Sequence, residues 1–150
     1  MDYEAKWGKM TVQIARLTAG VAGAFTDVFT PVQGSFALNV EEGNKLEAFI
    51  EGGERIASRK DANKYTLEFQ VYLGGDLAKP IEDVDGVISD EYAIRVIPEN
   101  AALEGFLMGR TAVSVIESFT AEEGHRATYT FEALKPATGK MMEPYTAPEA

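Results

Sequence analysis

The chain has 150 residues, 45% of them hydrophobic, no cysteine and a formal net charge of −10. This length and composition fit one domain with a packed core. The lack of cysteine excludes a disulfide scaffold, a thiolate nucleophile and any cysteine-ligated metal site. Nucleic acid and anionic lipid are bound through basic side chains, so the excess of acids argues against tight binding to either.

Two features bear on membranes and export. No stretch approaches the roughly 18 consecutive apolar residues of a membrane span. Residues 1–10 contain two acids and no continuous apolar segment, which is not the pattern of a secretory signal. We therefore expect no membrane partner and no signal peptide.

The first third of the chain predicts two strands. Residues 11–17 alternate Val12 and Ile14 with polar side chains, which is typical of a half-buried strand. An irregular extended piece or loop is expected over 21–30. The second strand is predicted over 35–40, where apolar side chains again fall on one face.

A core-poor region follows. Residues 45–50 have an extended pattern, a glycine pair then marks a turn, and 56–59 fit a short return strand. About two dozen residues with few bulky anchors precede the next strand. In a compact domain such a length predicts a protruding loop, which we place at 51–64.

The clearest strand pattern is that of residues 65–73. Polar side chains separate apolar ones throughout, which predicts one face on the core and one towards water. The apolar residues at every second position are Tyr65, Leu67, Phe69, Val71 and Leu73.

The second half begins with an acidic connection over 77–90, with room for one helical turn. A strand is predicted over 92–97, and 99–105 is the best position for a single short helix because its alanines and leucine favour one. Residues 111–119 and 126–134 predict a hairpin joined by a six-residue link at 120–125.

These elements predict a mostly β chain: an antiparallel β-sandwich or barrel with one short helix and a long projecting hairpin loop. We expect a single domain over 1–150 with its globular core at about 11–136. Residues 1–10 would form an N-terminal arm. Residues 137–150 contain little core material and are expected to form a C-terminal arm or to be disordered.

The sequence offers little for catalysis or metal binding. His125 is the single histidine and lies in a predicted turn, which does not fit a catalytic triad. The acidic run 82–85 lacks the alternating ligands of a calcium loop, and the glycine pairs lack the lysine of a phosphate loop. We therefore assign no catalytic, cofactor-binding or metal-ligating residue and expect no enzyme. A hydrolase with an acidic pair remains an alternative, although no spacing singles out one pair.

The charges are unevenly distributed. Basic side chains gather in the predicted projection, whereas residues 82–91 are almost purely acidic. Opposite patches on one chain suit head-to-tail association, in which one surface meets a different surface of the next copy. The alternative is that these are ordinary surface charges.

Three motifs resemble the major tail tube proteins of long-tailed bacteriophages and the related tube proteins of contractile injection systems. They are Glu-Gly-Gly-Glu at 51–54 with Lys-Tyr-Thr-Leu-Glu-Phe at 64–69, Glu-Tyr-Ala-Ile-Arg-Val-Ile-Pro at 91–98, and Tyr-Thr-Phe-Glu-Ala-Leu-Lys-Pro at 129–136. The likeness covers about residues 35–136. We expect no sizeable extra C-terminal domain of the kind that the family's better-known members have.

The resemblance implies a small β-sandwich or barrel flanked by one helix, with six copies in a ring and rings stacked into a tube. Its partners would be further copies of itself and other tail proteins, with DNA as passing cargo that is not tightly bound. Its location would be the virion tail, after assembly in the host cytoplasm. The loop at 51–64 becomes the candidate for ring stacking, and its charged candidates are Glu51, Glu54, Arg55, Arg59, Lys60 and Lys64.

A second function from a different class stays open. A monomeric β-sandwich could bind a carbohydrate-type ligand, for which exposed aromatic side chains serve as stacking platforms. The candidates for that role are Trp7, Tyr72 and Tyr145.

Overall fold

The computed structural model describes residues 9–27, 31–32, 34–74, 79–100, 102–136 and 138–146. They form eleven strands, and every strand pairing is antiparallel. The prediction of a mostly antiparallel β chain is therefore confirmed. The strands are β1 (Thr11–Thr18), β2 (Val21–Ala22), β3 (Thr26–Asp27), β4 (Ala37–Glu41), β5 (Lys45–Phe49), β6 (Arg55–Lys60), β7 (Lys64–Tyr72), β8 (Tyr92–Ile97), β9 (Gly105–Thr120), β10 (Gly124–Ala133) and β11 (Glu143–Tyr145).

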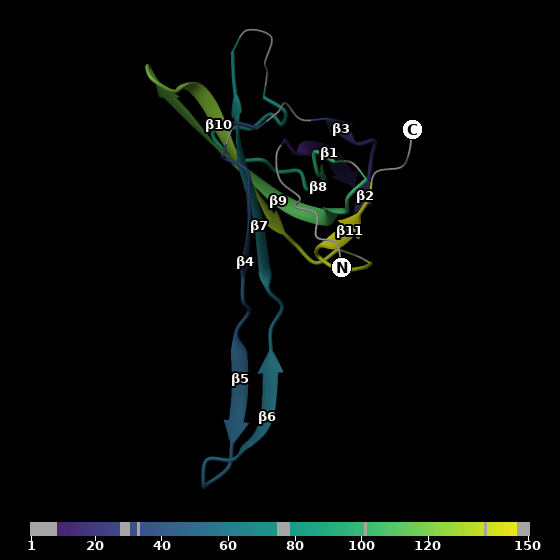
Figure 1. The fold of residues 1–150 in the computed structure, drawn as a ribbon, viewed down its shortest axis with the longest axis vertical. Coiled ribbons are helices and arrows are strands. Elements are labelled where there is room, and N and C mark those ends of the chain that lie inside the picture. The colour runs from purple at the N-terminus through teal and green to yellow at the C-terminus, as the bar shows by residue number, and fades with distance from the viewer. Residues whose placement is uncertain are drawn as a thin grey trace.

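Nine strands belong to one sheet with the order β2-β1-β8-β9-β10-β7-β4, to which β3 and β11 are attached through β1 and β9. The 16-residue strand β9 connects the two halves of this sheet. One of its edges pairs first with β11 and then with β10, and the start of its other edge pairs with β8. Figure 1 shows β9 curving from the β8 side of the body to the β10 side.

The core lies between these two halves. Phe69 of β7 is only 1% exposed and stacks on the rings of Tyr129 and Phe131 of β10, with centroids 6.2 and 5.6 Å apart. The facing half contributes side chains from β1 and β8 to the same cluster. The buried members from the four strands are Val12, Ile14, Leu67, Phe69, Val71, Ile94, Val96, Ala127, Tyr129 and Phe131.

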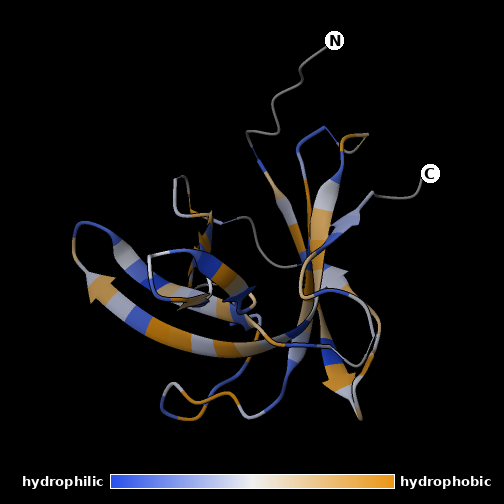
Figure 2. Cartoon of the chain, turned by 90° about the horizontal axis from the view of Figure 1, so that it is seen from below, coloured by the Kyte–Doolittle hydropathy of each residue, from blue (hydrophilic) through white to orange (hydrophobic). Residues whose placement is uncertain are grey.

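The alternation of hydrophobic and hydrophilic residues along the strands can be followed in Figure 2. In β7 it puts Leu67, Phe69 and Val71 in the core, while Tyr65 is partly buried. The inward and outward faces of the 65–73 stretch are therefore those that the sequence predicts. Successive side chains of a strand point to opposite faces, so the pattern alone determines this result.

The helix predicted over 99–105 is not seen: none of the residues that the structure describes is helical, and residue 101 lies outside them. A turn forms instead, in which the amide of Leu103 donates to the carbonyl of Asn100 at 3.0 Å. The Asn100 side chain also accepts from the amide of Ala102 at 3.1 Å, and such local bonds compete with helix formation. Gly105 then begins β9.

The C-terminal tail differs from the expected arm over part of its length. Residues Glu143–Tyr145 form β11, which pairs with the start of β9. The guanidinium of Arg95 lies 4.8 Å from the Tyr145 ring and 4.0 Å from the Phe25 ring, so a cation–π contact holds the strand against β8. The expected N-terminal arm falls mostly on residues 1–8, which lie outside the described part, as do 147–150.

The hairpin predicted near the C-terminus has a shorter link than expected. Thr120 and Gly124 are already paired, so only residues 121–123 remain as the turn between β9 and β10. Gly124 has a φ of +77°, which is a conformation that glycine adopts without strain.

At the ends of the sheet, β2 and β4 pair with no further strand among the described residues, so the sheet is open. The described residues contain no helix long and apolar enough to cross a membrane.

Candidate functional site

The most unusual part of the structure is a two-stranded sheet made by β5 and β6, residues 45–60, which we call the arm. It extends from the β4–β7 pair far beyond the body of the protein (Figure 1). At its base the amide of Asp61 donates to the carbonyl of Asn44 at 2.8 Å, so the two connections are joined there. Gly43 allows this approach, because a Cβ at that position would clash with the backbone of Asp61.

The tip of the arm is a tight turn at residues 51–53. The amide of Ile50 donates to the carbonyl of Glu54 at 3.0 Å, and the amide of Gly53 donates to the carbonyl of Ile50 at 3.1 Å. Gly52 and Gly53 have φ values of +98° and +86°, which explains the glycine pair. The short return strand expected at 56–59 lies within β6, so this part of the predicted projection is a strand as far as Lys60.

Every residue of β5 and β6 is exposed, including large apolar ones. Phe49 is 58% exposed and Ile56 61%, although both are side chains that gain by burial. The exposed large apolar side chains of the arm and its tip are Leu46, Phe49, Ile50 and Ile56. A hairpin with two strands and no covered face is marginally stable on its own in water, so the arm has the properties of a surface that another molecule covers.

The six predicted assembly residues are spread along this region and do not form one cluster. Glu51 and Glu54 lie at the tip, and Arg59 lies opposite Leu46 across the pair of strands. Lys64 lies in the first position of β7, between the base of the arm and the body of the protein. These side chains are exposed, and the structure brings no pair of the six together in an ion pair.

Arg55 and Lys60 instead pair with acids that the sequence does not single out. Arg55 contacts Glu47 at 3.1 Å, and Lys60 lies 3.8 Å from Glu42, which also contacts Lys45 at 3.1 Å. The hydrogen bond from Lys45, with the nearby charge of Lys60, lowers the pKa of Glu42. Because all these groups are exposed, the pairs add little stability and leave the charges available to a partner.

A second feature is the pair of open strand edges in the layer β4-β7-β10-β9. The outer edge of β4 is unpaired within the described chain. On the far side of the layer, β8 pairs with β9 only up to Thr111, and a single bridge joins Val87 to Ser114. From Ile116 to Thr120 this edge of β9 has no partner strand among the described residues. Open edges of this kind are templates for pairing with another chain.

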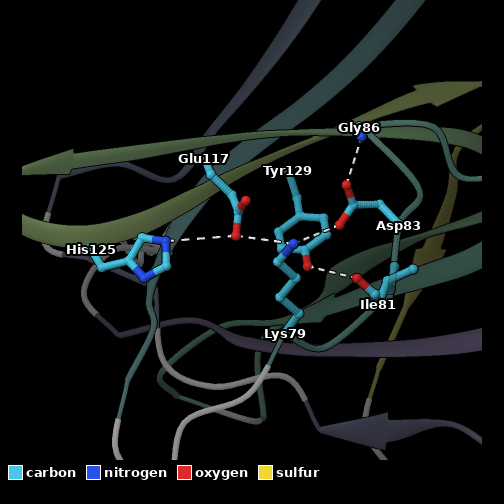
Figure 3. A network of polar contacts seen from close by, with 7 residues as sticks. All are labelled: Lys79, Ile81, Asp83, Gly86, Glu117, His125 and Tyr129. Atoms are coloured by element: carbon cyan, nitrogen blue, oxygen red, sulfur yellow. Dashed lines mark hydrogen bonds and ion pairs between the residues drawn. The ribbon is translucent and has the colours of Figure 1, made fainter.

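The acidic connection before β8 is held against β9 and β10 by the polar network in Figure 3. The Lys79 ammonium contacts Asp83 at 2.8 Å and Glu117 at 3.0 Å. Asp83 also accepts from the amide of Gly86 at 2.6 Å, and the Tyr129 hydroxyl donates to the carbonyl of Ile81 at 2.9 Å. The network therefore fixes the connection in place.

The predicted acidic patch over 82–91 is consequently weakened by internal pairing. Besides Asp83, Asp90 contacts Arg16 at 3.2 Å, and Glu91 contacts Arg110 at 3.0 Å. These contacts neutralise a large part of the stretch within the same chain. A head-to-tail contact between the arm and this stretch therefore has less support than the sequence predicts.

Two pKa shifts follow from the network. The hydrogen bonds from Lys79 and from the Gly86 amide hold the pKa of Asp83 below its usual value of 3.8. Burial raises the pKa of Tyr129 to about 12, so its hydroxyl stays protonated and donates over the whole physiological range. Neither group is poised to exchange protons near neutral pH.

We predict that Asp83→Asn lowers the free energy of unfolding at pH 7, since it removes the charge that faces Lys79. A carboxylate with a lowered folded pKa contributes stability above its unfolded pKa and loses it as the pH falls through the folded one. The difference from the unsubstituted protein should therefore shrink as the pH falls below 3.8. Urea unfolding at pH 7 and in strong acid measures it. Asp85→Asn, at an exposed neighbour, is the control, and an equal difference at both pH values would contradict the prediction.

His125 contacts one acidic and one aromatic side chain. Its Nε2 lies 3.6 Å from Glu117, and its ring makes an edge contact with Phe119 at 5.7 Å. No group of three or more His, Cys, Asp or Glu side chains suited to a metal ion occurs in the described ranges.

The aromatic candidates for a carbohydrate platform have other neighbours. The Arg126 guanidinium lies 5.0 Å from the centre of the Tyr72 ring and donates to its hydroxyl at 3.2 Å. Tyr145 is stacked by Arg95 as described above, and Trp7 lies outside the described residues. One face of each described ring is therefore occupied by a side chain of the same protein.

No family model and no curated protein matches this chain. The site is thus defined by its geometry: an arm that exposes apolar side chains, and one layer with two open edges. The sequence indicates the position of the turn and the charged residues around it. It does not indicate the apolar surface, because the pattern of 45–50 is equally that of a strand with a buried face.

Proposed function

We propose that this protein is a structural subunit that assembles with copies of itself into rings, which stack into a tube of the phage-tail or injection-system type. The single observation that carries the proposal is the arm, because it places exposed apolar side chains at a distance from the core. The subunit would act without catalysis, and it would have other tail proteins as further partners.

The arm supports assembly through the energy of burial. Covering a Phe or Ile side chain contributes about 1.5–3 kcal/mol, so a neighbour that covers Phe49 and Ile56 gains substantially. An isolated subunit gains nothing from displaying them. The arm also reaches away from its own body, which suits a contact with a subunit in the next ring (Figure 1).

The open edges support closure within a ring. The edges of β4 and β9 lie on opposite sides of the same layer, β4-β7-β10-β9. Pairing β4 of one copy with β9 of the next is a heterologous contact, which generates a ring when the rotation closes. The layers of all copies would then form one continuous barrel between subunits. This differs from the barrel predicted for the single chain, whose sheet is open among the described residues. The helix of the predicted fold has no support among the described residues.

The charge suits a tube through which DNA passes. The outward positions of the layer include the exposed acids Glu68 and Glu132, beside threonines of β7 and β10. The chain as a whole carries −10. A wall with this charge repels phosphate, so DNA would be passing cargo and not a bound ligand. The virion tail, after assembly in the host cytoplasm, is the corresponding location.

The test is direct observation of assembly. We expect concentrated protein to show rings or tubes by negative-stain electron microscopy and a concentration-dependent heavy species in sedimentation velocity. A protein that stays monomeric at the highest attainable concentration, with neither rings nor tubes in the images and none after addition of preformed tail tips as initiators, would refute the proposal.

A further inference from the structure

A hollow of about 350 Å³ lies where the start of β9, the end of β8 and the strand β11 meet. Apolar side chains form most of its wall. The residues around it are Met10, Phe36, Val96, Pro98, Glu104, Gly105, Phe106, Met142, Glu143 and Pro144. Its size lies within the range of about 300–1,000 Å³ in which proteins bind small apolar groups.

Two residues shape the strand pairing around this hollow. A Cβ at Gly105 would clash with the carbonyl of Val96, so glycine lets the backbones of β8 and β9 approach closely beside the hollow. Pro144 of β11 has no amide proton, so the strand presents a ring there and no further donor. The hollow is therefore built into the pairing of β8, β9 and β11.

The charges at the hollow have one sign. Glu104 is exposed and Glu143 half-buried, and the described lining includes no basic side chain. A fitting partner would present an apolar side chain next to a cation.

The arm presents this combination. Phe49 is paired with Arg55 across the two strands, so the two side chains lie on the same face of the arm. Residues 45–60 contain four basic and three acidic side chains, so the arm carries one net positive charge, whereas the whole chain carries −10. The arm is thus the cationic, apolar element of an acidic protein.

We propose that the hollow receives the arm of a second copy, with Phe49 inside it and Arg55 facing Glu104. This inference rests on the proposed function and names the surface to which the arm binds. The arm of the same chain is not the occupant, because it is directed away from the body, and β5 and β6 pair only with each other in the described part of the chain.

One arm and one hollow per subunit make this contact heterologous. Each copy would bind the hollow of one neighbour and offer its own hollow to another, so the contact repeats without limit. This property is what stacking of successive rings requires. Lateral pairing of β4 and β9 uses different residues and is independent of it.

The absence of native cysteine allows a clean cross-linking test. We would mix Glu54→Cys, at the exposed tip, with Pro144→Cys, at the exposed mouth of the hollow, and add a short bismaleimide. One variant carries an affinity tag so that the mixed dimer is distinguished by mass. The matched control replaces Pro144→Cys with Glu132→Cys, an exposed site on β10 away from the hollow.

We expect the mixed dimer with Pro144→Cys and not with Glu132→Cys, and particles in the same sample by electron microscopy. Particles without the mixed dimer, as when a small apolar ligand or the chain's own N-terminal segment fills the hollow, would overturn this inference and leave the proposed function standing. The mixed dimer without rings or tubes would support the contact and count against the tube. If neither the mixed dimer nor particles form, both this inference and the proposed function are refuted. Cross-linking of the control equal to that of Pro144→Cys would refute the inference.

A charge exchange gives a second test that does not depend on cysteine. Arg55→Glu should lower the yield of the mixed dimer about tenfold, because it places like charges together. Adding Glu104→Arg to the other partner should restore it. Loss of cross-linking that the second substitution does not restore would contradict the pairing of Arg55 with Glu104.

Discussion

Replacing Phe49 and Ile56 together with serine is expected to abolish rings and tubes while leaving the subunit folded. Both side chains are exposed on the arm and make no contribution to the core cluster. The free energy of unfolding should therefore change by no more than about 0.5 kcal/mol. Electron microscopy and sedimentation velocity measure assembly, and urea unfolding measures stability.

The control for this experiment is Val21→Ser. Val21 is an equally exposed apolar residue, but it lies in β2, away from the arm. It should assemble as the unsubstituted protein does. If the double variant still forms particles, the arm is not the assembly surface, and if both variants lose them, the effect is a general one of surface hydrophobicity.

Phe69→Ala should lower the free energy of unfolding by about 3–5 kcal/mol, which is the cost of removing a buried aromatic ring and leaving a cavity. The ring is 1% exposed and stacks with Phe36, Tyr129 and Phe131. Chemical denaturation monitored by circular dichroism measures the change. In a small domain of marginal stability, such a loss is a large fraction of the total.

Phe119→Ala is the matched control, since it removes the same ring from the 76% exposed position in β9. Its effect should stay within about 0.5 kcal/mol. Equal losses for both variants would mean that Phe119 is covered in solution, for example by a second copy at the open edge of β9. A small loss for Phe69→Ala would contradict the position of the core.

The strands could be predicted where burial is one-sided. Residues 65–73 alternate so regularly that the pattern indicates both the strand and its inward face, and β7 has both. The turn at the tip of the arm was also predictable, because its glycines adopt positive φ values that other residues avoid. In each case the cause lies within a few residues of its effect.

The helix at 99–105 was predicted from composition, and the prediction failed for a local reason as well as a distant one. Asn100 forms a turn with its own neighbours, and Gly105 is drawn into the pairing with β11. The tail was expected to lack structure because it has little core material. It nevertheless contributes β11, since Arg95 stacks on Tyr145, a contact between residues 50 positions apart that no local pattern encodes.

The candidate site was predictable in position but not in character. The sequence placed a projection near 51–64 and singled out its charged residues, whereas the geometry draws attention to Phe49, Ile56 and the open edges of β4 and β9. Exposure depends on what packs against a residue, and an apolar residue in a strand has the same pattern whether its face is covered or bare.

For this protein, the alternation of side chains along each strand decided the strand faces, the turns and the mostly β class, because these are properties of neighbouring residues. The order of strands, the bare arm and the open edges were decided only when the chain came together in space. Those features depend on which distant segments pair with β9 and β7 and on which surfaces are left without a partner. The proposed assembly rests on that second group of features.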